Sequence, residues 1–313
     1  MSLFAPTIQV VSDLHLETPI GLPSYASFKI PIHSSNLFLL GDIGLVKDDA
    51  LFNFLRKLLR NRSLHIFYLL GNHEPYQLSL SSTVERMRNS ESECKLSFGG
   101  RFIFLNRDRY DLSSTITILG CTLWSDVEAD QAADVAARLT DFNDQRGIRD
   151  CLEAEEPHRQ VIVATHHCPT KNPRALDPQH VASPISSGFT SDLSNEYCWT
   201  CPAVRLWAFG HTHYSCSYYD DKKLVISNQK GYHSLEKQNQ EAVKDLVVIE
   251  AMGQWQISAP SPNKQPIHTG PSETNTIKRS SPENKTQTSR LSLLLRAADR
   301  LKAFRRTRPA SSK

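Results

Sequence analysis

The sequence lacks any uninterrupted run of about eighteen apolar residues, the length that a membrane-spanning helix requires. Its first ten residues, MSLFAPTIQV, also lack the basic start and the apolar stretch of a secretory signal. Cysteine is sparse, because the 313 residues contain only seven, an odd number that excludes a small disulfide-stabilised domain and favours reduced thiols. Together these absences predict a cytoplasmic protein.

Negative charge is scarce at the C-terminal end of the chain. Residues 259–313 contain twelve Lys and Arg against three Asp and Glu, a net charge of +9, so the chain total of +3 leaves −6 for residues 1–258. The positive charge is therefore confined to the tail. The sequence pI of 8.4 does not indicate that the acidic body binds nucleic acid.

Short apolar runs rich in β-branched and aromatic residues recur along the body, each followed by a polar turn, and this pattern predicts buried strands. Residues 47–60 and 82–90 have helical composition. Strands alternating with helices predict an α/β sandwich with a mixed sheet. The expected strands are 8–12, 37–40, 64–70, 101–105, 115–124, 161–165, 204–209, 223–227 and 246–250.

The chain divides by composition into a folded domain over residues 1–258 and two further segments. Residues 127–156 are acidic and rich in Ala, and we interpret them as a helical cap inserted in the domain. Residues 259–288 are rich in Pro, Ser, Thr and Asn, which predicts a disordered linker.

Residues 289–313 form a basic tail that begins with an amphipathic helical pattern over 289–306. We weigh three interpretations of it: a segment that binds a membrane surface or a protein partner, a basic signal that directs the chain to the nucleus, or a terminal helix without a partner. The apolar stripe consists of Leu291, Leu294, Leu295, Ala298, Leu301 and Phe304.

Metal-ligand side chains follow five of the expected strands at the point where each strand ends. Because the carboxyl ends of strands gather at one edge of an α/β sheet, we expect these side chains to converge in one cleft. They are Asp13 and His15, Asp42, Asn72 and His73, His166, and His211 and His213.

The spacing of these residues suits two metal ions. Residues two apart on an extended segment point the same way, so Asp13 with His15 can chelate one ion, as can His211 with His213. A carboxylate such as Asp42 can offer one oxygen to each of two ions held ~3.5–4 Å apart, the geometry of two-metal hydrolysis. Asp42 is therefore the candidate bridging ligand.

The ordered motifs resemble those of the calcineurin-like metallophosphoesterases, whose blocks are D-x-H, G-D, G-N-H, H and G-H-x-H. The resemblance covers most of the folded body and implies a four-layer α/β sandwich of the metallophosphoesterase type. The blocks here read Asp13-Leu14-His15, Gly41-Asp42, Gly71-Asn72-His73, His166 and Gly210-His211-Thr212-His213.

The resemblance also implies a set of roles. Asp13, His15, Asp42 and His213 would bind the first metal ion, and Asp42, Asn72, His166 and His211 the second. His73 would stay free of metal and act as general acid or electrostatic partner. The two ions would be divalent transition metals such as Mn, Fe or Zn, and would activate water for in-line attack on phosphorus.

Some alternatives stay open at the level of sequence. Spacing does not decide whether His166 or its neighbour His167 is the ligand, and Glu74 is expected to begin a helix or hold a loop. Cys198 and Cys201 have the spacing of half a zinc site, but packing thiols are the simpler interpretation. The same fold also serves as a non-catalytic binding module.

The kind of phosphoester is narrowed by what the motifs lack. Protein Ser/Thr phosphatases of this family carry an Asp-Arg-Gly segment after the second block and an Arg before Asn-His, and this chain has neither. The motifs look most like those of small, uncharacterised bacterial and fungal members. A small-molecule phosphomonoester or phosphodiester is therefore the favoured substrate class.

Overall fold

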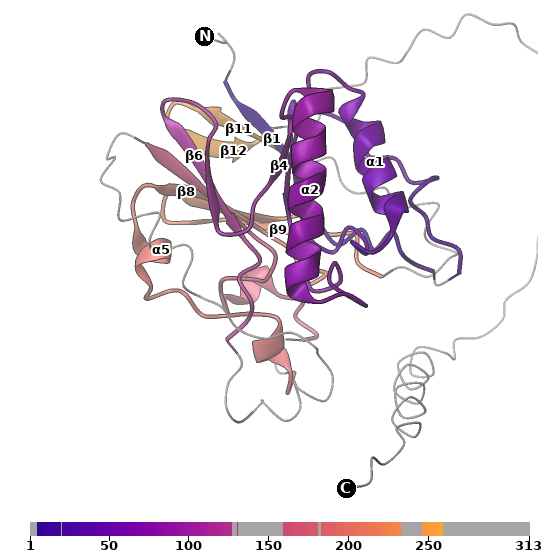
Figure 1. Cartoon of the computed structure of the whole chain (residues 1–313). Helices are drawn as coiled ribbons and strands as arrows, with labels where there is room; N and C mark the ends of the chain where they lie inside the picture. Colours follow the sequence, from indigo (N-terminus) through magenta and orange to yellow (C-terminus); the bar gives the residue numbers. More distant parts are fainter. Residues whose placement is uncertain are drawn as a thin grey trace, which may run out of the picture. The chain divides into compact units, whose positions relative to one another are not determined.

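The computed structural model describes residues 5–19, 21–126, 130, 159–180, 183–232 and 246–258 (Figure 1). All of these belong to one compact unit, Met1–Pro262, and a second unit comprises Asn263–Lys313. The cap over 127–156, apart from Asp130, the linker 259–288 and the tail 289–313 lie outside the described residues, so these segments stay predictions. No helix in the described part of the chain is long and apolar enough to cross a membrane.

The first of two six-stranded sheets has β1 at its centre. Strands β1 to β4 are parallel, and the two C-terminal strands join the edge of β1 in antiparallel pairing. In spatial order the sheet contains β12 (Gln254–Ile257), β11 (Val247–Ala251), β1 (Thr7–Val11), β2 (Asn36–Leu40), β3 (His65–Leu69) and β4 (Phe102–Phe104).

The second sheet has a parallel centre and an antiparallel strand at each edge. In spatial order it contains β5 (Asp108–Asp111), β6 (Ile116–Cys121), β7 (Gln160–Thr165), β8 (Val204–Phe209), β10 (Lys223–Ser227) and β9 (Cys216–Asp220). Both sheets are mixed, which confirms the predicted α/β fold with mixed sheets.

Three apolar clusters separate four layers. Between the sheets, inner-face residues such as Phe38, Phe67 and Leu206 are fully or almost fully buried. Helices α1 (Asp49–Leu59) and α2 (Leu80–Phe98) cover the outer face of the first sheet, as Figure 1 shows for α2 beside β4. The short helix α5 (Tyr197–Thr200) and the 3₁₀ turns η1 (Pro173–Ala175) and η2 (Ser186–Gly188) lie in the segments that follow β7, and Trp199 and Ala175 pack on the outer face of the second sheet. The predicted four-layer sandwich is confirmed.

The apolar pattern of the sequence predicts helix α1 accurately but only part of helix α2. In α1 the buried residues Leu51, Phe54, Leu55 and Leu59 recur at helical spacing, and the helix matches the prediction closely. Helix α2 begins after Ser79, whose hydroxyl accepts the N–H of Ser82 at 3.1 Å. It continues to Phe98, beyond the predicted end at residue 90. The prediction stops short because the last two turns of the helix are mostly polar and carry no apolar pattern.

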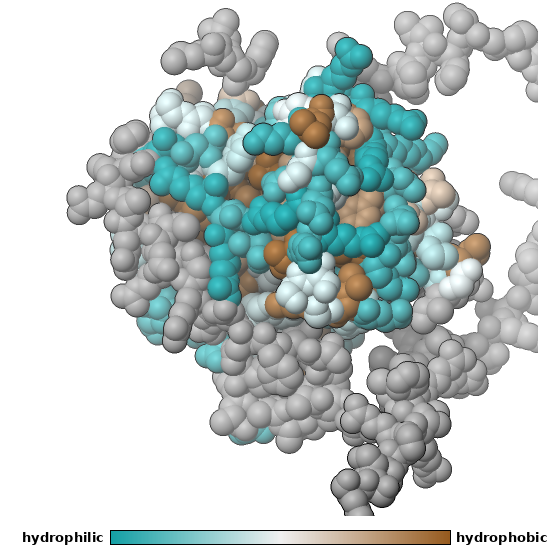
Figure 2. All heavy atoms as spheres, viewed as in Figure 1, coloured by the Kyte–Doolittle hydropathy of each residue, from teal (hydrophilic) through white to brown (hydrophobic). Residues whose placement is uncertain are grey.

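Every predicted strand is present, within three residues of its predicted ends. The edge strands β5, β9 and β12 are not among the predicted ones, because each has exposed or half-exposed residues and little apolar periodicity. On the face shown in Figure 2 most residues are hydrophilic, and hydrophobic residues gather in small separate groups. The buried apolar residues form the three clusters between the layers.

Candidate metal centre

The predicted ligands gather where five strands end. Strands β1, β2 and β3 belong to the first sheet and β7 and β8 to the second, so the cluster draws on both sheets. The structure brings all seven side chains together, and all except His213 belong to buried residues. The seven are Asp13, His15, Asp42, Asn72, His166, His211 and His213.

One side of the cluster consists of Asp13, His15 and His213, here called the Asp13 group. The Nε2 atoms of His15 and His213 lie 3.0 Å apart, and His213 Nε2 lies 3.4 Å from Asp13 Oδ1. Their nearest donor atoms lie within 4.8 Å of one another, close enough to hold a single ion. Asp13 is held from behind, because its carboxylate accepts the Ser12 hydroxyl and the backbone N–H of His211.

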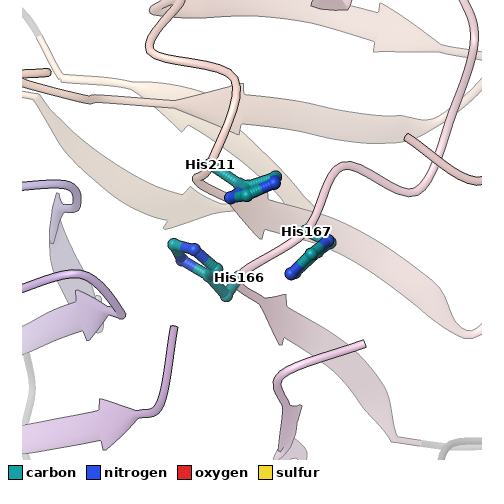
Figure 3. Close-up of side chains that lie close together, drawn as sticks. All are labelled: His166, His167 and His211. Carbon is teal, nitrogen blue, oxygen red and sulfur yellow. The ribbon is translucent and has the colours of Figure 1, made fainter. Parts of the chain in front are cut away.

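The other side consists of Asn72, His166 and His211, here called the His166 group. Asn72 Oδ1 lies 3.1 Å from His166 Nε2, and the rings of His166 and His211 are 4.9 Å apart between centroids. Figure 3 shows the rings of His166 and His211 close together on loops from neighbouring strands. An amide oxygen with two imidazoles suits a divalent transition metal.

Asp42 lies between the two groups. Its Oδ2 is 3.9 Å from His15 Nε2, and its Oδ1 is 3.5 Å from His166 Nε2. Burial opposes the charge of this carboxylate, but the nearby His166 and His73 hold the pKa of Asp42 well below its usual value. One carboxylate oxygen therefore faces each group, as a shared ligand requires.

The imidazoles are oriented by acceptors on the ring nitrogen that faces away from the cluster. His15 Nδ1 lies 3.3 Å from Glu17 Oε1, His166 Nδ1 lies 2.8 Å from the Leu40 carbonyl, and His211 Nε2 lies 3.3 Å from the Gly188 carbonyl. A carbonyl or carboxylate oxygen can only accept, so each of these nitrogens carries the proton. The opposite nitrogens of His15 and His211 are then left as lone pairs, as in metal-binding histidines. Burial favours the neutral ring of His166, but the charge of Asp42 raises the pKa of His166 to about 10, so its Nε2 carries a proton that an ion would displace.

His167 is placed differently from His166. Its Nδ1 lies 2.7 Å from Ser125 Oγ, whose hydroxyl donates to the Gly188 carbonyl, and its ring stacks on His211 at 3.9 Å between centroids. His166, by contrast, faces Asp42 and Asn72. The donor nitrogens of His166, His167 and His211 lie within 4.8 Å of one another, and His166 is the one of this neighbouring pair that contacts Asp42 and Asn72.

The backbone at the cluster departs from the extended form expected for the paired ligands. Asp13, His15, Asp42, His211 and His213 have positive φ values between 48° and 69°. The expectation of an extended D-x-H and H-x-H is therefore wrong. The chain turns sharply over the end of each strand, and the left-handed residues still aim their side chains into one cluster. Such a conformation costs roughly 1–2 kcal/mol per non-glycine residue and is concentrated at functional sites.

Two glycines of the motifs are explained by close approach. A Cβ on Gly71 would lie 2.2 Å from Asp42 Oδ1, and a Cβ on Gly210 would lie 2.1 Å from Ser12 Oγ and 2.7 Å from Asp13 Oδ2. Any side chain at these positions would displace a carboxylate of the cluster. Glycine is needed there because the neighbouring strand ends approach so closely.

His73 lies beside the cluster. Its Nδ1 is 3.0 Å from Glu17 Oε1, and its Nε2 is 2.7 Å from the Tyr232 hydroxyl and 4.0 Å from Asp42 Oδ2. Burial favours the neutral ring, but the charge of Asp42 and the hydrogen bond to Glu17 outweigh it and raise the pKa of His73 to about 9. The ring is thus able to carry a proton at the edge of the cluster.

Three further residues lie near the cluster, and the sequence pattern predicts no catalytic or metal-binding role for them: Glu74, Glu17 and Tyr232. Glu74 is fully buried and accepts four hydrogen bonds, so its expected part in holding a loop fits the structure. Glu17 joins His15 to His73, and the Tyr232 ring stacks on His15 at 4.1 Å. Nothing in the residue pattern distinguishes them, since acids and tyrosines in turns are common.

The cysteines take no part in a metal-ligand cluster of the described residues. Cys201 packs in the apolar cluster around Trp199, with Cys198 beside it. The interpretation of this pair as packing thiols is supported over half a zinc site.

Comparison with known proteins agrees with the geometry. Residues 6–215 match the calcineurin-like phosphoesterase family, and the chain belongs to this family. It is 27% identical over 259 residues to "Uncharacterized protein L509" of Acanthamoeba polyphaga mimivirus, covering 72% of this chain and 91% of that protein. It is also similar in fold to the phosphopantetheinyl hydrolase PptH of Mycobacterium tuberculosis, with a TM-score of 0.52, 16% identity, and coverage of 84% of this chain and 99% of that chain.

Proposed function

We propose that this chain is a metal-dependent hydrolase of phosphoester bonds that uses two divalent ions. The observation that carries the proposal is the position of Asp42, which turns one oxygen toward the Asp13 group and the other toward the His166 group. Two ions held there would neutralise the charge of the phosphate and lower the pKa of a water for attack on phosphorus. The donor set of carboxylate, amide and imidazole suits Mn, Fe or Zn.

The ligand assignment follows from the same geometry. Each ion would be held by one of the two groups together with Asp42. The outer acceptors on three imidazoles support this assignment, because they turn the opposite nitrogen of each ring toward the cluster. The first ion would take Asp13, His15, Asp42 and His213, and the second Asp42, Asn72, His166 and His211.

His73 is proposed as the proton donor to the departing alkoxide. Its Nδ1 donates to Glu17, and because the pKa of His73 is raised to about 9, a second proton on Nε2 faces the exposed Tyr232. A donor placed there would act on the oxygen that leaves phosphorus and would stabilise the developing charge. The ring is kept out of both ligand groups, which leaves it available for this step.

A small-molecule phosphomonoester or phosphodiester is the proposed substrate class. It is supported by the segments Gly41-Asp42-Ile43-Gly44 and Leu70-Gly71-Asn72, which lack the arginines that protein phosphatases of the family carry. A purely binding role on the same fold is disfavoured because no ligand of the motifs has been replaced.

The proposal is tested by metal content and turnover together. Purified protein reconstituted with Mn²⁺ is expected to hold about two ions per chain and to hydrolyse members of a panel of aryl phosphomonoesters and phosphodiesters. Asp42→Asn is expected to lose both ions and turnover, whereas His73→Ala keeps the ions and loses turnover. Full turnover by both variants would contradict the mechanism, and ions without turnover of any ester would identify a binding module.

A further inference from the structure

One carboxylate serves two histidines with different proposed tasks. Glu17 Oε1 lies 3.3 Å from Nδ1 of His15 and 3.0 Å from Nδ1 of His73. The two rings meet edge to face with their centroids 4.6 Å apart. The Glu17 side chain is only 9% exposed, so it is taken out of water to make these two contacts.

Glu17 is held in this place by the backbone that precedes it. The N–H of His15 donates to the Asp42 carbonyl at 2.9 Å, and the N–H of Leu16 donates to the Ile43 carbonyl at 3.0 Å. These bonds fix the chain alongside the end of β2, and a turn closed by the N–H of Thr18 on the His15 carbonyl follows. The Glu17 side chain therefore starts from a fixed point beside both rings.

Other carboxylates near His73 are committed elsewhere. Asp42 Oδ2 is 4.0 Å from His73 Nε2 and is the proposed bridging ligand. Glu74 uses both oxygens to accept backbone N–H groups and the Tyr68 hydroxyl. The second oxygen of Glu17 is buried without a hydrogen-bond partner among the described residues, so the hydrogen bonds that this carboxylate accepts come from the two imidazoles.

The chemical effect is to fix which nitrogen of each ring faces Glu17 and which faces away from it. A carboxylate that accepts from Nδ1–H leaves Nε2 of His15 as a lone pair, and that atom faces His213 and Asp42. The same acceptor turns Nε2 of His73 toward the Tyr232 hydroxyl at the mouth of the cluster. Neither ring can rotate out of its place without losing a hydrogen bond to a buried charge.

We propose that Glu17 is a positioning residue that couples the two halves of the proposed mechanism: it orients His15 as a metal ligand and His73 as a proton donor. This inference rests on the proposed function. It predicts that one substitution weakens metal binding and proton donation together, through two separate contacts. A carboxylate that merely filled space would do neither.

The first test measures ion binding and needs no turnover. Calorimetric titration of metal-free protein with Mn²⁺ is expected to show about 10-fold or more weaker binding in Glu17→Ala, and a smaller loss in Glu17→Gln, whose amide oxygen can still accept one N–H. Asp49→Asn, an exposed carboxylate remote from the cluster, is the control and is expected to bind as the wild type does. Urea unfolding of each variant shows that it is folded.

The second test measures proton donation at saturating Mn²⁺. Substrates that differ only in the leaving alcohol are compared, from 4-nitrophenol to an alkyl alcohol. Because a poor leaving group depends most on the acid, Glu17→Gln is expected to lower kcat by about 10-fold or more for the alkyl ester and much less for the nitrophenyl ester. The double variant Glu17→Gln/His73→Ala is expected to depend on the leaving alcohol no more steeply than His73→Ala alone.

Each outcome decides part of the inference. Unchanged Mn²⁺ affinity in Glu17→Ala overturns the contact with His15, and an equal loss of kcat for every leaving alcohol overturns the contact with His73; the coupling requires both. Wild-type protein that hydrolyses no ester contradicts the proposed function and the proton-donor half with it. The affinity comparison still decides the His15 half in that case, so the two failures are distinguishable.

Discussion

Glu74 Oε2 accepts the backbone N–H of Asp42 at 2.9 Å, so an acid that follows β3 holds the residue that follows β2. The same carboxylate accepts the N–H of Ile43 and of Gly71 and the hydroxyl of Tyr68. All of these donors are buried, and no other carboxylate of the described residues makes these contacts. The turn that carries Asp42 is therefore fixed from its inner side by one side chain.

Glu74→Ala is expected to destabilise the protein by about 3 kcal/mol or more, because it leaves several buried donors without an acceptor at about 1–3 kcal/mol each. Urea unfolding measures this change. The control is Glu93→Gln, an exposed acid paired with Arg56, which is expected to change stability by less than about 0.5 kcal/mol. Equal stability of the two variants would show that Glu74 does not hold the turn.

Gly71→Ala is expected to abolish ion binding while the chain still folds. The new Cβ would lie 2.2 Å from Asp42 Oδ1 and would push the proposed bridging oxygen out of place. Gly99→Ala is the matched control, because Gly99 has a φ of 65° but nothing within 4 Å of the added Cβ. It is expected to cost about 1 kcal/mol in stability and to leave ion binding unchanged. Calorimetric titration with Mn²⁺ distinguishes the two, and normal binding by Gly71→Ala would contradict the close-approach argument.

Removal of ions by a chelator is expected to lower the melting temperature. Ions that bind only the native state stabilise it by about 2.7 kcal/mol at a hundredfold excess over Kd, which corresponds to about 5 °C or more for a domain of this size. Scanning calorimetry with and without EDTA measures the shift. His73→Ala is expected to keep the shift and Asp42→Asn to lose it, and an identical shift in Asp42→Asn would remove that residue from the ligand set.

Thr165→Val is expected to lower the free energy of unfolding of the protein by about 1–3 kcal/mol. The Thr165 hydroxyl accepts the indole N–H of the fully buried Trp207 at 3.1 Å and donates to the His167 carbonyl at 2.9 Å. Valine has the same shape but leaves the indole N–H without an acceptor. Thr200→Val, at an exposed position, provides the control for urea unfolding, and a change no larger than in this control would show that the hydroxyl contributes nothing.

Replacing Cys198 and Cys201 by Ser is expected to leave the metal content unchanged. No metal-ligand cluster of the described residues contains a cysteine, and Cys201 is buried among apolar side chains. Elemental analysis of the double variant tests this expectation. Loss of one zinc ion per chain would instead support the interpretation of Cys198 and Cys201 as half of a zinc site.

The cluster was predictable because its ligands are tied to the strands. Asp13, Asp42, Asn72, His166 and His211 all follow apolar runs that are recognisable in the sequence. Parallel strand ends meet at one edge of a sheet, so strand identity alone groups Asp13 with Asp42 and Asn72, and His166 with His211. The order of the strands and the pairing between distant ones are not needed for that inference. The approach of these two sets depends on how the two sheets pack.

What the sequence did not predict depends on turns and edges. Glu17 and Tyr232 act through loops whose path is set by tertiary hydrogen bonds, and no periodicity marks such residues. The left-handed backbone at Asp13 and His15 was missed for the same reason, since only the packing of neighbouring strand ends selects it. Edge strands such as β5 are half-exposed and polar, so the hydrophobic signal that identifies central strands is absent.

The seven side chains of the candidate centre come from both sheets of the sandwich. Sliding one sheet over the other would move Asp42 away from His166 and Asp13 away from His213 at the same time. Ions held by both sheets would therefore resist such shear at this end of the sandwich. In return, the apolar interior between the sheets keeps the ligands of one sheet aligned with those of the other, so a substitution among Phe38 and Phe67 would shift the ligands without replacing one.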